Sequence, residues 1–115
     1  MSNYNLLTNQ KVTQSAPPPV VPVDPWGTVL GVTNPLSQTF QLVITGSAGN
    51  VSGTVQIVVS NDGVNWQNYG DPMVAASGYL TAQAQFTGTQ PWTWFGAILT
   101  AISGTNAVAN LIMAA

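Results

Sequence analysis

The stretch that decides the fold is VSGTVQIVVSNDGVNW, residues 51–66, in which an alternating segment runs into a turn. Val55, Ile57 and Val59 recur at every second position, with polar residues between them apart from Val58. This period places the apolar set on one face of a β-strand. Asp62-Gly63 then tolerates the positive φ that tight hairpin turns require. Residues 51–66 therefore predict a strand followed by a hairpin turn.

The same alternation recurs on both sides of this stretch, in residues 40–45 and 79–87, with Val43 as a further exception. Two more apolar runs, residues 92–102 and 107–113, have small residues on both faces, as in strands that are covered on both sides. Turn-forming residues separate the runs, which is typical of a sandwich or barrel. Residues 36–115 thus predict an all-β domain, a small antiparallel β-sandwich or jelly-roll-like barrel. The predicted core consists of Phe40, Leu42, Ile44, Val55, Ile57, Val59, Trp66, Leu80, Phe86, Ile98 and Leu111.

Residues 1–35 contain six of the eight prolines and predict an extended N-terminal arm. Proline lacks the amide donor and fixes φ, so it disfavours helices and central strands. One interpretation of the arm is a solvated linker. The other is a segment that docks on a partner, and its apolar residues favour this second interpretation. The predicted partner-binding residues of the arm are Val20, Val21, Val23 and Trp26.

The chain is almost without charge, which excludes several classes of function. Only Lys11, Asp24, Asp62 and Asp71 are charged, 3% of the residues against about 25% in typical domains, and there is no His or Cys. General acid–base catalysis usually needs His or a carboxylate paired with another titratable group, zinc sites want Cys or His, and phosphate-backbone binding relies on Lys and Arg. One lysine and three scattered aspartates cannot build such sites within one subunit. We therefore expect no enzyme activity, no catalytic residues, no cofactor, no metal and no nucleic-acid partner.

A membrane role is also disfavoured. The apolar run at residues 92–102 is about half of the ~20 residues that a spanning helix needs. Residues 1–10 are largely polar, so no signal peptide is expected.

The segment Ser60-Asn61-Asp62-Gly63-Val64-Asn65-Trp66 resembles S-N-D-G-x-x-W hairpins found in β-sandwich modules of phage structural proteins and in some carbohydrate-binding modules. Asp62 can accept bonds from nearby backbone amides while Trp66 packs beneath the turn. The simplest interpretation is a well-made hairpin. A Ca²⁺ site at Asp62 is disfavoured, because Ca²⁺ prefers six or more oxygen ligands and usually several carboxylates.

Trp92 and Trp94 lie two residues apart, on the same face if their segment is a strand. Exposed aromatic rings could stack on sugars or anchor a protein partner. Alternatively, both rings cover one end of the sandwich. Trp92 and Trp94 are therefore candidate partner-binding residues.

Low charge also favours association, because charge normally keeps proteins apart and the buried cores of interfaces are depleted in it. The arrangement of a short Pro-rich arm, then a β domain with SNDGVNW near its middle, then a closing aromatic strand followed by an apolar one, resembles small bacteriophage capsid decoration (cement) proteins. The resemblance implies a structural virion protein on the capsid surface. Such a protein binds and stabilises the shell of major capsid protein, with a dimer or trimer of the chain as the expected unit. The alternative is a tail, head-fibre or receptor-binding component that contacts host glycans through Trp92 and Trp94.

Overall fold

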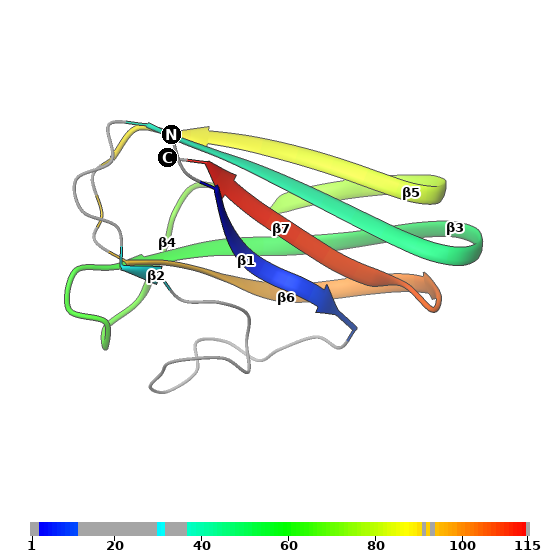
Figure 1. Cartoon of the computed structure of the whole chain (residues 1–115), viewed down its shortest axis with the longest axis horizontal. Helices are drawn as coiled ribbons and strands as arrows, with labels where there is room; N and C mark the ends of the chain where they lie inside the picture. The colour runs from blue at the N-terminus through cyan, green and yellow to red at the C-terminus, as the bar shows by residue number, and fades with distance from the viewer. Residues whose placement is uncertain (1–2, 12–29, 32–36, 91, 93, 115) are drawn as a thin grey trace.

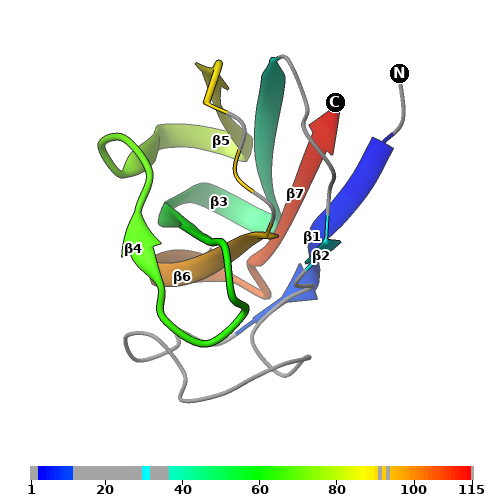
Figure 2. The ribbon, with the colours of Figure 1, turned by 90° about the vertical axis from the view of Figure 1, so that its left-hand side faces the viewer.

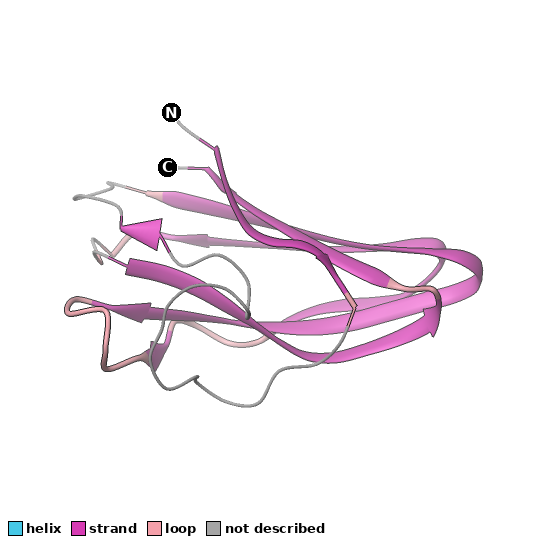
Figure 3. Ribbon diagram, turned by 60° about the horizontal axis from the view of Figure 1, so that its bottom comes forward, coloured by secondary structure: helices cyan, strands magenta, loops and turns pink. Residues whose placement is uncertain are grey.

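The computed structural model describes residues 3–11, 30–31, 37–90, 92 and 94–114, which form strands and their connections without a helix (Figure 3). The strands are β1 (Asn3–Gln10), β2 (Leu30–Gly31), β3 (Gln38–Ser60), β4 (Gln67–Asn68), β5 (Met73–Gly88), β6 (Trp94–Thr105) and β7 (Val108–Ala114). Every pairing between them is antiparallel. The predicted all-β class is confirmed.

Strands β3 and β5 form one long ribbon that doubles back on itself (Figure 1). Their register runs without a shift from Gln38 opposite Gly88 to Thr45 opposite Thr81, and then shifts before Asn50. One half of the ribbon is flanked by β7 and β1, and the other by β6 and β2. The result is a single antiparallel sheet that curls into a half-barrel (Figure 2). A strand predicted to end at residue 45 instead continues through the bend to Ser60.

The main core lies inside the curl and follows the predicted alternation. Four rings, Phe40, Tyr69, Phe86 and Phe95, pack together there with centroids 5.6–6.3 Å apart. Phe86 is only half-buried at its margin. The predicted core residues that are fully buried in this cluster are Phe40, Leu42, Ile44, Val55, Ile57, Val59 and Leu111.

Three predicted core residues lie elsewhere. Ile98 is buried with Val58 in a second, smaller cluster, against which the half-buried Trp66 packs. Residues 95–99 of β6 are all buried, as expected of a strand that is covered on both sides. Trp66 therefore covers this second cluster and is not part of the main core. Leu80 is half-buried at the bend of the ribbon, where its φ is 61°.

Strand β1 differs from the expected N-terminal arm. Asn3–Gln10 pairs with β7, and the two strands lie side by side in Figure 1. A register shift between Asn5 and Leu7 interrupts the alternation, so the consecutive Leu6 and Leu7 are both fully buried in the main core. This part of residues 1–35 therefore belongs to the sheet. Residues 12–29, which include Val20, Val21, Val23 and Trp26, lie outside the described residues.

Candidate functional site

The turn after β3 is organised by the carboxylate of Asp62. Its Oδ1 accepts the backbone N–H groups of Val64 and Asn65, both at 2.8 Å, and the hydroxyl of Ser60 at 2.9 Å. The side-chain amide of Asn65 donates to Oδ2 at 2.8 Å. Ser60 Oγ in turn accepts the N–H of Gly63 at 2.9 Å, and Gly63 adopts the predicted positive φ, 75°. The carboxylate thus holds together the turn that joins β3 to the segment before β4.

These bonds make the charged form of Asp62 the favoured one. The backbone amides of Asn65 and Val64, followed by the side chains of Asn65 and Ser60, hold the pKa of this carboxyl well below its usual range. The described residues contain no group of three or more His, Cys, Asp or Glu side chains placed to hold a metal ion. The Asp62 oxygens are instead occupied by the turn's own donors.

We predict that Asp62 makes the fold less stable at acidic pH than at neutral pH. Its folded-state pKa lies below the ordinary value of 3.8. The carboxylate therefore stabilises the fold above that pH, and this contribution is lost as the pH falls toward the lowered folded-state pKa. In urea titrations from neutral pH to below 3.8, the wild-type midpoint should fall. The urea midpoint of Asp62→Asn should fall less over the same pH range than that of the wild type. Asp71→Asn, the matched control for removal of a carboxylate, should show the full wild-type fall. Equal pH dependence in all three proteins would contradict the prediction.

The indole of Trp94 packs against this turn. A Cβ added at Gly63 would lie 3.6 Å from both Cε2 and Nε1 of Trp94. Trp94 is half-buried and stands opposite Ser60 in the pairing of β6 with β3. The turn and the first residue of β6 therefore form one unit at the end of the sheet that carries the connection between β3 and β4 (Figure 2).

Trp92 has different surroundings. It precedes β6, so the strand geometry that would place it on one face with Trp94 does not apply. Its Nε1 donates to Gln90 Oε1 at 3.0 Å, and its half-buried ring packs against the main core. The binding role of Trp92 and Trp94 stays a prediction.

A buried network around Tyr69 holds the segment that leads to Trp92. The Tyr69 hydroxyl donates to Gln38 Oε1 at 2.7 Å and accepts the backbone N–H of Gln90 at 3.0 Å. Gln38 Nε2 donates to the Gln90 carbonyl at 3.0 Å. Tyr69, Gln38 and Gln90 were not among the predicted core or site residues. Gln38, however, stands in phase with the apolar set that begins at Phe40, so the alternation could have marked it as a polar side chain on the inner face.

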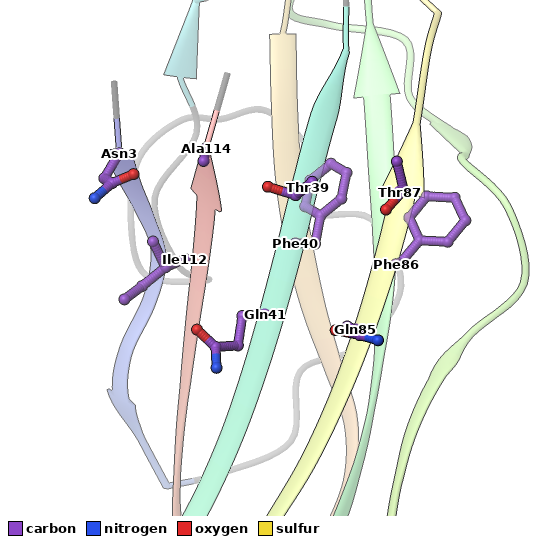
Figure 4. Close-up of a pocket in the computed structure, with 9 residues that line it drawn as sticks. All are labelled: Asn3, Thr39, Phe40, Gln41, Gln85, Phe86, Thr87, Ile112 and Ala114. Carbon is purple, nitrogen blue, oxygen red and sulfur yellow. The ribbon is translucent and has the colours of Figure 1, made fainter. Parts of the chain in front are cut away.

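The outer face of the sheet is hollowed where β1, β7, β3 and β5 run side by side (Figure 4). The hollow has a volume of about 420 Å³. Its lining residues are Asn3, Thr39, Phe40, Gln41, Gln85, Phe86, Thr87, Ile112 and Ala114. This outer face is uncharged, and it combines hydroxyl and amide groups with the exposed Ile112.

Comparison with known proteins found no similar protein. No protein-family model, curated protein or solved structure matches the chain. None of the described residues forms a helix that is long and apolar enough to cross a membrane.

Proposed function

We propose that the chain is a non-enzymatic structural protein of a bacteriophage virion, a decoration protein that binds the outer surface of the major capsid protein shell and stabilises it. One observation carries the proposal: strands β1 to β7 contain no charged residue. The described charges, on Lys11, Asp62 and Asp71, all lie in connections. An uncharged, hydroxyl- and amide-rich sheet surface is suited to permanent attachment, because the buried cores of interfaces are depleted in charge.

The outer face over β7, β3 and β5 is the proposed contact. It offers the hollow lined by Thr39, Gln41 and Ile112, in which polar groups can bond to a partner without the cost of burying charge. The Pro-rich residues after β1, with Val20 and Trp26 among them, supply the second proposed contact. In this proposal the curled sheet is a variant of the β-sandwich or jelly-roll modules that such proteins use.

The proposal predicts attachment that resists salt. Raising the salt from about 0.1 M to about 1 M shortens the Debye length from about 10 Å to about 3 Å and weakens charged contacts only. Purified chain bound to decoration-free capsids of its own phage should therefore stay bound through this series in sedimentation assays. Gln41→Lys, which places a charge in the outer face, should lower the occupancy, whereas Gln67→Lys, at an exposed site in β4, should not. Release at moderate salt, or no binding to capsids, would overturn the proposal.

A tail or receptor-binding role is the second candidate, because Trp94 presents a half-buried indole beside the Asp62 turn. It predicts specific sugar binding on a glycan array that is lost in Trp94→Ala. Sugar binding without capsid binding would favour this role over decoration.

A further inference from the structure

Residues 81–88 of β5 form an edge that, among the described residues, has none of the usual protection against pairing. Among the described residues, β5 pairs with β3 alone, which leaves its other edge without a strand. Residues 81–88 hold their register with β3 without a bulge and contain neither proline nor charge. Natural edge strands are normally blunted by charges, prolines, bulges or short length. This half of β5 is therefore a template for a further strand.

The sequence of this edge reads alike in both directions. It runs Thr81-Ala82-Gln83-Ala84-Gln85-Phe86-Thr87, so that threonine, an apolar residue and glutamine lie in mirrored order on each side of Ala84. Two antiparallel copies centred on Ala84 would bring each threonine opposite a threonine and each glutamine opposite a glutamine. A strand that is its own complement in this way fits a second copy of itself.

Burial follows the same symmetry. The threonines and glutamines of residues 81–87 are exposed on the outer face, whereas Ala82 is buried and Ala84 and Phe86 are half-buried on the inner face. The centred register would align Ala82 with Phe86 of the second copy. Polar residues would then meet polar residues outside, and apolar residues would meet apolar residues inside.

Within one copy, β3 and β5 already pair identical residue types with each other. On its paired edge, β5 places Thr87 opposite Thr39, Phe86 opposite Phe40 and Gln85 opposite Gln41. Cross-strand pairs of threonine and of aromatic residues stabilise antiparallel sheets. The threonine–threonine and glutamine–glutamine pairs expected between copies therefore have counterparts within one copy.

The absence of charge favours a second copy as the occupant. Two copies carry identical charges, and like charges directly opposite each other destabilise a strand pair. An edge without charge escapes this repulsion. The backbone donors and acceptors of the edge then supply the attraction, as in other cases of strand addition.

We propose that two copies of the chain associate through antiparallel pairing of residues 81–87 of β5 about a two-fold axis at Ala84. The sheet order β1-β7-β3-β5 then continues into the second copy. This self-association holds whatever surface the chain decorates and does not depend on the capsid proposal.

Charge substitutions test both the edge and its register. Gln83→Lys with Gln85→Lys sets lysines opposite lysines, so dimerisation of the full chain in sedimentation equilibrium should weaken roughly tenfold or more. Gln83→Lys with Gln85→Glu sets opposite charges face to face only in the centred register and should restore the dimer. Gln41→Lys, on the same outer face but one strand inward, is the control and should leave the dimer intact. Because Gln41→Lys is also expected to weaken capsid attachment, the two proposals can fail separately.

A disulfide gives a second measurement that does not rely on the stability of charged variants. The chain has no cysteine, so Ala84→Cys introduces the only thiol. Opposite residues in an antiparallel pair have Cα atoms about 4.5–5.5 Å apart, within disulfide range. In Thr81→Cys the two thiols would lie six positions apart along the strands, roughly 20 Å, and should not cross-link. Oxidation should therefore give a covalent dimer of the first variant and not of the second.

Two sets of results decide the proposal. A wild-type dimer that the paired lysines dissociate, together with cross-linking at position 84 alone, supports it. A wild-type chain that stays monomeric, paired lysines that leave the dimer unchanged, or equal cross-linking of the two cysteine variants would overturn it.

Discussion

Replacing Leu6 and Leu7 together by alanine should unfold the protein. Both side chains are fully buried in the main core. A buried Leu→Ala change costs about 2–5 kcal/mol, and small domains hold only about 5–15 kcal/mol in total. The double variant should therefore lose the cooperative thermal transition in circular dichroism, or aggregate.

Asn5→Ala is the matched control, because Asn5 is exposed on the same strand and should leave the melting temperature nearly unchanged. Deleting residues 1–11 should have the effect of the double leucine variant. If the truncated chain melted like the full chain, residues 1–35 would instead form the independent arm that their prolines suggest.

Tyr69→Ala should lower the stability of the fold more than other single substitutions at the end of the core beside Gln90. It removes a ring in contact with Phe40, Phe86 and Phe95, together with the hydroxyl bonded to Gln38. Removing a buried aromatic side chain costs on the order of 3–5 kcal/mol. Denaturant unfolding should show this loss as a lower midpoint.

Tyr69→Phe separates the two contributions, because it keeps the ring and removes only the hydroxyl. The hydroxyl makes two hydrogen bonds, each worth roughly 0.5–1.5 kcal/mol, so Tyr69→Phe should cost less than Tyr69→Ala, which also removes the ring. Gly88→Ala gives an independent check, since a Cβ at Gly88 would overlap the Tyr69 hydroxyl, which would have to move. Equal losses for Tyr69→Phe and Tyr69→Ala would show that the hydrogen bonds outweigh the packing.

The alternation of Phe40, Leu42 and Ile44, like that of Val55, Ile57 and Val59, sufficed to predict the inner face of the sheet. A period of two is imposed by the strand itself, so it survives whatever the sheet packs against. The course of β3 through residues 46–49 could not be predicted from the same pattern. Glycine and serine there are compatible with a hairpin turn and with a bent strand alike.

Strand β1 shows where local patterns fail. Leu6 and Leu7 are adjacent, and both point into the core only because the register shifts beside them. A bulge depends on the partner strand, here β7 at the far end of the chain, and leaves no period to detect. The prolines that follow residue 11 made the whole of residues 1–35 look like an arm.

The candidate site was predictable where it depends on local chemistry. Asp62 and Gly63 act in the turn as their spacing indicated, because the donors lie within three residues. Trp66 was wrongly predicted to lie in the main core. It packs instead on a second apolar cluster of Val58 and Ile98, which only the pairing of β3 with β6 brings together. Val58, an exception to the alternation in its strand, was a visible sign of this cluster.

The pairing of β1 with β7 also sets an order of events during biosynthesis. Strand β1 cannot pair with β7 until residues 108–114 have been made, because Asn3 lies opposite Ala114. Until then Leu6 and Leu7 have no core to enter. Contacts between such distant segments also slow folding. Leu6 and Leu7 therefore stay without their partner strand while residues 8–107 are synthesised, and chaperone binding or aggregation should begin there.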